Sequence, residues 1–151
     1  MALEEDIRAL SAVSLFSELT REQLRLIAFG AENMRLAPGK TLYRQNAPAD
    51  CAFVIVSGEV ELVDTAEGQA RTLRTAGPGA ILGEIALIAP TTRLTGAVAS
   101  GNAEIIRINR SLFRRILEEY PEVAAKLHAR FARELEELTR DVARMQRRFD
   151  V

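Results

Sequence analysis

The spacing of apolar and polar positions changes twice along the chain, which divides it into three zones. In residues 1–30 apolar positions recur at helical spacing, and Thr20 has the hydroxyl expected of a helix N-cap. In residues 31–108 short apolar runs alternate with glycine, proline and asparagine, which is typical of strands and turns. From residue 109 the helical spacing returns. The pattern predicts N-terminal helices, a central β region and C-terminal helices.

The central zone predicts an antiparallel barrel. The run CAFVIVSGEVELVD indicates two strands joined at Ser57–Gly58, with Val60, Leu62 and Asp64 on one face. The segments ARTLRTA, RLTGAVAS and AEIIRIN supply further strands. Many short strands separated by turns favour a closed barrel or jelly roll. We therefore expect one mainly β domain of the α+β class over residues 1–151: an antiparallel β-jelly-roll barrel flanked by N-terminal helices and two C-terminal helices.

The last zone predicts two helices in succession. Pro121 ends the first, RSLFRRILEEY, and opens the second, which extends to about Phe149. From Leu135 onward its apolar residues follow a heptad spacing, as in a coiled coil. These residues are Leu135, Leu138, Val142, Met145 and Phe149. The spacing predicts a homodimer through this helix, with packing on the chain's own barrel as the alternative.

Charge and hydropathy narrow the class of protein. The 20 basic and 21 acidic residues nearly cancel, which removes the global charge expected of a nucleic-acid-binding protein. A small arginine cluster on the last helix is interspersed with acidic residues and is interpreted as a solvated face. No apolar run approaches the roughly 20 residues of a membrane span, and the acidic N-terminus is unlike a signal peptide. We expect a cytoplasmic protein.

The residues needed for metal binding or catalysis are scarce. A single histidine, His128, and a single cysteine, Cys51, cannot form a conventional zinc or copper cluster or the histidine set of a metal-dependent cupin. Nor does a Ser/His/Asp set occur in motif form. The run Gly39-Lys40-Thr41 lacks the earlier glycine of a phosphate loop, because position 34 is methionine. We expect neither enzymatic activity nor a metal or cofactor.

The segment GAILGEIALIAPTTRLTGAVAS places two charged residues in an otherwise apolar stretch. A short helix after Gly83 would expose backbone N–H groups that favour an anion. Arg93 adds a fork of donors suited to a phosphate with two free oxygens. An ionised Glu84 only accepts, so it needs a hydroxyl or amide donor. A ligand with a phosphate next to a sugar hydroxyl would satisfy all three features. A buried Glu84–Arg93 ion pair is the alternative, although such pairs add little net stability.

The run Leu82-Gly83-Glu84-Ile85-Ala86-Leu87, followed by Arg93-Leu94-Thr95, resembles the phosphate-binding cassette of the cyclic nucleotide-binding domain family. The resemblance extends over nearly the whole chain, and the C-terminal helices are similar to those of catabolite activator proteins. It implies that Arg93 binds the exocyclic oxygens of the cyclic phosphate and that Glu84, after Gly83, accepts the ribose 2′-hydroxyl. The remaining implied contacts are backbone groups of Ile85, Ala86, Leu94 and Thr95 at the phosphate, and Leu62, Leu73, Leu82 and Thr139 at the base.

Three departures from the family pattern bear on the ligand. Leu82 replaces the usual phenylalanine. Asn46 stands where the family usually has glycine, and asparagine tolerates a positive φ better than most residues. Leu94 lacks the hydroxyl that commonly holds guanine directly after the arginine. The resemblance therefore implies cAMP as the ligand, with cGMP as the alternative because Thr95 offers a hydroxyl one residue later.

The expected function is a non-enzymatic sensor domain that binds cAMP and whose last helix transmits occupancy. One alternative is a regulatory fragment of a larger channel, transporter or transcription regulator. Another is a degenerate domain whose pocket binds no nucleotide and serves protein interaction. Direct binding to DNA is not expected, because no helix-turn-helix follows the long helix in this sequence.

Overall fold

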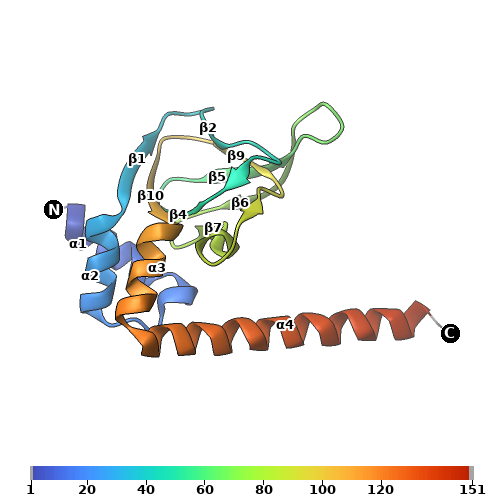
Figure 1. The fold of residues 1–151 in the computed structure, drawn as a ribbon. Helices are drawn as coiled ribbons and strands as arrows, with labels where there is room; N and C mark the ends of the chain where they lie inside the picture. The colour runs from blue at the N-terminus through green and yellow to red at the C-terminus, as the bar shows by residue number, and fades with distance from the viewer. Residues whose placement is uncertain (1, 150–151) are drawn as a thin grey trace. The chain divides into compact units, whose positions relative to one another are not determined.

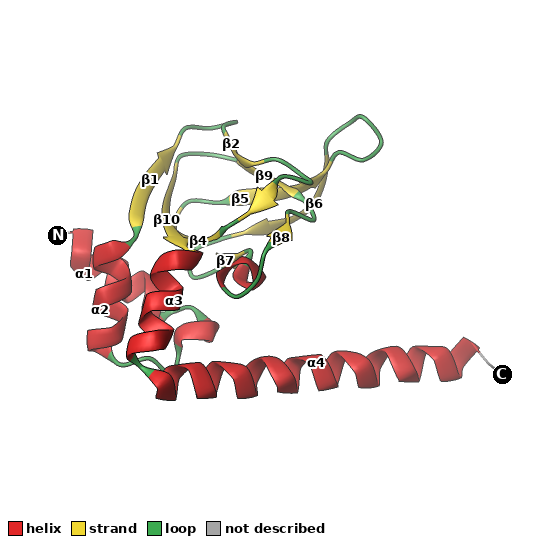
Figure 2. Cartoon of the chain, in the orientation of Figure 1, coloured by secondary structure: helices red, strands yellow, loops and turns green. Residues whose placement is uncertain are grey.

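A computed structural model describes the backbone of residues 2–149 and the side chains of residues 3–134 and 136–144. Figures 1 and 2 show its helices and strands. The helical elements are α1 (Ala2–Ser11), the 3-10 turn η1 (Ser14–Phe16), α2 (Arg21–Gly30), the 3-10 turn η2 (Glu84–Leu87), α3 (Arg110–Glu119) and α4 (Pro121–Phe149). The strands are β1 (Glu32–Leu36), β2 (Thr41–Tyr43), β3 (Pro48–Ala49), β4 (Cys51–Ser57), β5 (Val60–Asp64), β6 (Arg71–Ala76), β7 (Ile81–Leu82), β8 (Thr91–Thr92), β9 (Gly96–Ala99) and β10 (Ala103–Asn109).

The strands pair antiparallel throughout, in two four-stranded sheets and one short pair. The sheet orders are β1-β10-β4-β7 and β2-β9-β5-β6, and β3 pairs with β8. The consecutive strands β4 and β5 belong to different sheets, so the chain crosses from one to the other at Gly58. The predicted antiparallel jelly-roll barrel is confirmed.

Apolar side chains from both sheets form the core of the barrel. Phe53 and Ile55 of β4, Val60 and Leu62 of β5, and Ile105 of β10 belong to one buried cluster. Burial of large side chains such as these contributes about 1.5–3 kcal/mol each. The sheets thus hold each other in place and provide a rigid frame for the loops at the rim.

The register of β5 and β6 departs from regular pairing at one point. Leu62 lies opposite Arg74, but the next residue, Val63, lies opposite Thr72. Leu73 is therefore an extra residue on β6, as in a β-bulge. Val63 is buried along with Val60 and Leu62, so side chains on both faces of β5 are covered.

Local signals at the helix ends were predictive. The Thr20 hydroxyl accepts a hydrogen bond from the Gln23 N–H, and the Gln23 side chain accepts one from the Thr20 N–H, which completes a capping box. α3 ends at Glu119, and Pro121 is the first residue of α4, as the sequence predicts. The start of α2 thus follows from the capping residue Thr20, and the break between α3 and α4 follows from Pro121, which cannot continue a helix but can begin one.

The chain divides into two compact units, one up to Ile116 and one from Leu117 on. The single-domain organisation stays a prediction. The second unit contains α4, 29 residues long. Two residues of the predicted seam, Leu138 and Val142, are exposed in the single chain. The side chains of Leu135, Met145 and Phe149 lie outside the described residues. No helix within residues 2–149 has the length and apolarity needed to cross a bilayer.

Candidate functional site

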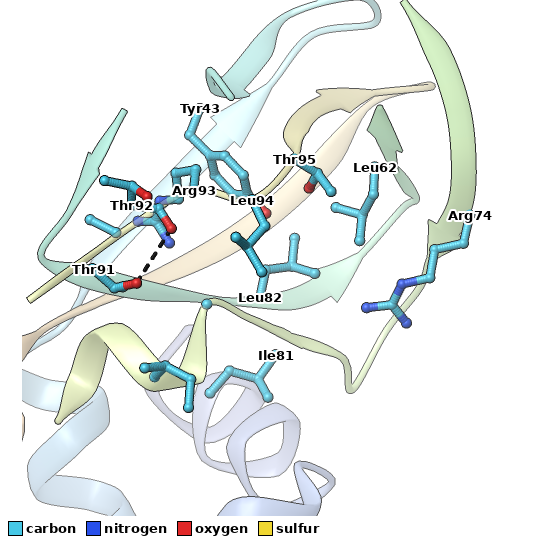
Figure 3. Close-up of a pocket in the computed structure, with 13 residues that line it drawn as sticks. Tyr43, Leu62, Arg74, Ile81, Leu82, Thr91, Thr92, Arg93, Leu94 and Thr95 are labelled. Carbon is cyan, nitrogen blue, oxygen red and sulfur yellow. Dashed lines mark hydrogen bonds between the residues drawn. The ribbon is translucent and has the colours of Figure 1, made fainter. Parts of the chain in front are cut away.

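A cavity of about 290 Å³ lies against β2, β5, β6 and β7 and the segment that follows them (Figure 3). Its wall contains seven of the residues predicted for ligand binding: Leu62, Leu82, Gly83, Ile85, Arg93, Leu94 and Thr95. These residues come from three separate stretches of the sequence, and the barrel brings them together. The cavity therefore lies where the sequence predicted a ligand.

Arg93 is the buried cation of this cavity, with 6% of its surface exposed. Its Nη2 donates to the carbonyl oxygen of Cys51 at 2.8 Å and lies 3.3 Å from the Cys51 Sγ. The guanidinium also lies over the rings of Tyr43 and Phe53, with its carbon 4.5 Å and 5.2 Å from the ring centroids. These contacts fix the side chain and favour its positive charge.

The hydrogen bonds of Arg93 are incomplete. Its buried Nη1 has no hydrogen-bond partner among the described residues. No carboxylate of the described residues forms an ion pair with Arg93, so the alternative of a structural Glu84–Arg93 pair is not formed. A buried charge without a counter-ion is costly unless an anion accompanies it. The unpaired positive charge and the free Nη1 donor of Arg93 thus favour the binding of an anion with acceptor oxygens.

The absence of a side chain at Gly83 leaves the space that the Arg93 guanidinium occupies. The φ of Gly83, 77°, lies in the left-handed region, and a Cβ at this position would overlap Nη1 of Arg93. Glycine has neither the Cβ nor the associated conformational penalty. Both the turn into η2 and the position of Arg93 therefore require glycine here.

The backbone of Arg93 is held from both sides. Its carbonyl oxygen accepts from the Asn46 N–H at 2.7 Å, and its own N–H donates to the Ala47 carbonyl at 2.9 Å. Asn46 has a φ of 69°, which confirms that asparagine here adopts the left-handed conformation. The Gln45 side chain donates to the Leu94 carbonyl at 3.1 Å, which secures the next residue as well.

The turn at η2 differs from the predicted cradle in one respect. The Ala86 N–H donates to the Gly83 carbonyl oxygen at 3.0 Å, because η2 is a 3-10 turn, and Ala86 is fully buried. This N–H thus has a partner within the turn, and its role at the phosphate stays a prediction. Among the described residues, the N–H groups of Ile85 and Leu94 donate no backbone hydrogen bond. These two remain able to complete a cradle with Arg93.

The role of Arg110, the first residue of α3, was not predicted from the sequence. Its Nε donates to the Ala86 carbonyl at 2.7 Å, and its Nη2 donates to the Ala49 carbonyl at 2.7 Å. Hydrogen bonds from a charged donor contribute roughly 1.5–3 kcal/mol each. Arg110 thus ties η2 and β3 to the start of α3. No motif precedes it, and only the folded chain brings its two acceptors together.

Other predicted residues lie outside the cavity wall. Glu84 is half-buried and is not part of the wall. Leu73 is 48% exposed and also lies outside it, whereas its neighbour Arg74 is in the wall. Thr139 is an exposed residue of α4, in the other unit of the chain. The proposed roles of these three residues at the ribose and the base remain predictions.

Tyr43 closes one side of the cavity. Burial raises the pKa of its phenol, although the charge of Arg93 and a hydrogen bond with Thr95 oppose this effect. A phenol with a raised pKa is neutral at physiological pH. Tyr43 therefore offers a ring face to the Arg93 cation and adds no charge of its own.

The sequence profile of the cyclic nucleotide-binding domain matches residues 33–120, more than half of the chain. The chain belongs to the cyclic nucleotide-binding domain family. The matched residues include β4, the cassette from Leu82 to Thr95 and all of α3. The cavity described above thus lies within the part of this cyclic nucleotide-binding domain that defines the family.

Known proteins agree with this assignment. The "Cyclic AMP receptor protein" of Thermus thermophilus is 34% identical over 125 residues, which cover 82% of this chain and 57% of that protein. A cyclic nucleotide-binding-like protein from Brucella abortus is 57% identical, with a TM-score of 0.70 over 76% of this chain and 98% of the other. The N-terminal domain of a transcriptional regulator from Streptomyces coelicolor is 27% identical, with a TM-score of 0.82 over 89% and 94% of the two chains. The chain thus spans just over half the length of the curated relative.

Proposed function

We propose that this domain is a non-enzymatic sensor that binds a cyclic purine mononucleotide, in the first place cAMP. The observation that carries the proposal is the buried Arg93, a cation with one unpaired nitrogen and no acidic partner among the described residues, in the wall of a cavity. A cyclic phosphate has one negative charge and two exocyclic oxygens, which match a guanidinium fork. The name of the Thermus thermophilus relative, a cyclic AMP receptor protein, supports cAMP as the ligand.

The remaining wall supports the same ligand. Leu62, Ile81 and Leu82 give the cavity an apolar side on which a purine can pack. Leu94, directly after Arg93, has no hydroxyl and is 85% exposed, so it offers guanine no hydrogen bond. Glu84 remains the proposed acceptor for the ribose 2′-hydroxyl. The domain makes no covalent change to the nucleotide in this proposal.

A thermal unfolding series tests the proposal directly. At about 100 times its dissociation constant, cAMP is expected to raise the free energy of unfolding by about 2.7 kcal/mol. At equal concentration 2′-deoxy-cAMP is expected to raise it less, because Glu84 would lose its donor. The open-chain 5′-AMP serves as the control for the cyclic phosphate. If no cyclic nucleotide changes the unfolding midpoint, the degenerate-domain alternative replaces this proposal.

The finer proposal is that α4 transmits occupancy to a partner or to a second copy of the chain. A ligand changes the equilibrium between two arrangements of a helix only through its different affinity for them. The exposed Leu138 and Val142 lie at heptad spacing, which favours a second α4 as the partner. Sedimentation velocity with and without cAMP tests this. A monomer in both conditions would contradict the dimeric form, and binding within a larger protein would remain the alternative.

A further inference from the structure

Gln45, just after β2, has every polar group of its side-chain amide engaged. Its Oε1 accepts from the Thr65 N–H at 2.7 Å and from the Thr65 hydroxyl at 2.9 Å. Its Nε2 donates to Asp64 Oδ1 at 3.2 Å and to the Leu94 carbonyl oxygen at 3.1 Å. An amide offers two donor hydrogens and two acceptor lone pairs, so these four hydrogen bonds use all of them. Gln45 thus joins three segments: the end of β2, the end of β5 and the turn that follows Arg93.

The amide of Gln45 has only one possible orientation. The Ala66 N–H donates to Asp64 Oδ1 at 3.0 Å, and this bond together with that from Gln45 lowers the pKa of the Asp64 carboxyl. Asp64 is therefore ionised at physiological pH and only accepts. Turning the amide over would place its oxygen against this carboxylate and the Leu94 carbonyl. The donor side of Gln45 must therefore face Leu94.

Two successive carbonyl groups of the turn after β8 bind to the segment after β2. The Arg93 carbonyl accepts from the Asn46 N–H at 2.7 Å, and the Leu94 carbonyl accepts from Gln45. In an extended strand successive carbonyls point to opposite edges, but Leu94 lies at a bend between β8 and β9. In a trans peptide the N–H points away from the carbonyl. The N–H groups of Leu94 and Thr95 therefore both point away from the segment after β2.

These two N–H groups are available to an anion. Leu94 and Thr95 are both part of the cavity wall, next to Arg93 (Figure 3). Among the described residues, neither N–H donates a backbone hydrogen bond. Successive N–H groups on one side of the backbone form a concave site that favours an anion. They add two backbone donors to the guanidinium of Arg93.

We propose that Gln45 is a positioning residue for the phosphate: by holding the Leu94 carbonyl, it turns the Thr95 N–H toward the ligand. This inference rests on the proposed nucleotide site and deepens it. Gln45 is not part of the cavity wall, so it acts through the backbone without touching the nucleotide. Without its donor, the peptide between Leu94 and Thr95 is free to rotate. A carbonyl turned toward the phosphate would replace a donor by an acceptor.

Substitutions at Gln45 and two modified nucleotides provide the test. Titration calorimetry measures the affinities for cAMP and for its two phosphorothioate analogues, each with sulfur in place of one exocyclic oxygen. Sulfur accepts hydrogen bonds less well than oxygen. Gln45→Ala is expected to weaken cAMP about tenfold, the size of one hydrogen bond to a charged group. The analogue whose sulfur faces the Thr95 N–H already lacks most of this bond, so it should weaken less than about threefold, and the other analogue should weaken as cAMP does.

Two further variants separate the donor of Gln45 from its size and from its residue type. Gln45→Glu keeps the acceptor for Thr65 but has no donor for Leu94 when ionised, so it is expected to weaken cAMP at least as much, with the same difference between the analogues. Gln69 lies in the loop between β5 and β6, is exposed and has no side-chain hydrogen bond within the described residues. Gln69→Ala is therefore expected to leave all three affinities unchanged. Circular dichroism of each variant checks that the barrel remains folded, and Gln45→Glu alone decides if Gln45→Ala does not fold.

Several results would overturn the inference. An equal loss for cAMP and both analogues would mean that Gln45 only stabilises the fold around the site. Undiminished cAMP binding by Gln45→Glu would mean that the donor to Leu94 has no part in holding the phosphate. Either result contradicts only the role of Gln45, because cAMP still binds to the unsubstituted chain. An unsubstituted chain that binds none of the three nucleotides contradicts the proposed function itself.

Discussion

Replacing Arg93 by alanine is expected to reduce the affinity for cAMP at least about a hundredfold. Each hydrogen bond to a charged group contributes roughly 1.5–3 kcal/mol, and a fork that holds two phosphate oxygens makes two of them. A loss of about 3 kcal/mol or more corresponds to two orders of magnitude in the dissociation constant. Arg74 lies beside Leu62 in another part of the wall and does not replace these bonds. Titration calorimetry with cAMP measures the change.

The same substitution is expected to leave the unliganded barrel folded. Arg93→Ala removes the hydrogen bond to the Cys51 carbonyl and the contacts with Tyr43 and Phe53. It also removes a buried charge that has no acidic partner among the described residues, and the free energy gained in this way offsets much of the loss. Thermal unfolding without ligand should therefore change little, whereas the shift produced by cAMP disappears.

Arg35→Ala is the control for this variant. The Arg35 side chain is 89% exposed, and its Nε lies 3.9 Å from Glu104 Oε1. Its replacement by alanine therefore removes one positive charge, as Arg93→Ala does, but from the surface and without loss of buried contacts. Exposed ion pairs of this kind contribute about 0–1 kcal/mol. The control is expected to bind cAMP as the unsubstituted chain does. An Arg93→Ala affinity within threefold of that value would show that the phosphate binds elsewhere.

The predictable parts of the site depend on residues whose own chemistry limits their conformation. Glycine and asparagine tolerate a positive φ, and the structure has this conformation at Gly83 and Asn46. Proline is restricted in φ and suits the first turn of a helix, and α4 begins at Pro121. Arg93 was recognisable for a similar reason, since a guanidinium within an apolar run requires a partner. Such signals are local, and the sequence displays them directly.

The parts that were missed depend on pairing and packing between distant segments. Arg74 lies opposite Leu62 of the cavity wall, where Leu73 was expected, because the pairing register of β5 and β6 shifts by one residue. The alternation of apolar and polar residues along β6 does not predict this shift. Arg110 is similar: its acceptors, the carbonyls of Ala49 and Ala86, lie 61 and 24 residues away in sequence. The engaged N–H of Ala86 depends on the choice of a 3-10 over an α-helical turn. Composition determines none of these three features.

Gly83→Ala is expected to abolish most of the binding without removing any polar group. Alanine in the left-handed region costs roughly 1–2 kcal/mol of stability. In addition, its Cβ would occupy the position of Arg93 Nη1, so the guanidinium must move away from the cavity. A displaced fork no longer meets both phosphate oxygens. We expect an affinity for cAMP lower by at least about thirtyfold, measured by calorimetry, together with a lower unfolding midpoint.

Gly79→Ala separates backbone strain from the displacement of Arg93. Gly79 has a φ of 87°, close to that of Gly83, but a Cβ there would meet only Ala12, with its Cβ at the ordinary contact distance of 3.6 Å and its carbonyl oxygen at 3.9 Å. The two variants should therefore lose similar amounts of stability from strain, and only Gly83→Ala should also lose cAMP. If both bind cAMP equally well, Arg93 does not need its observed position to hold the phosphate. If both lose it equally, the loss reflects a strained barrel, and the close approach of Gly83 to Arg93 has no special part in binding.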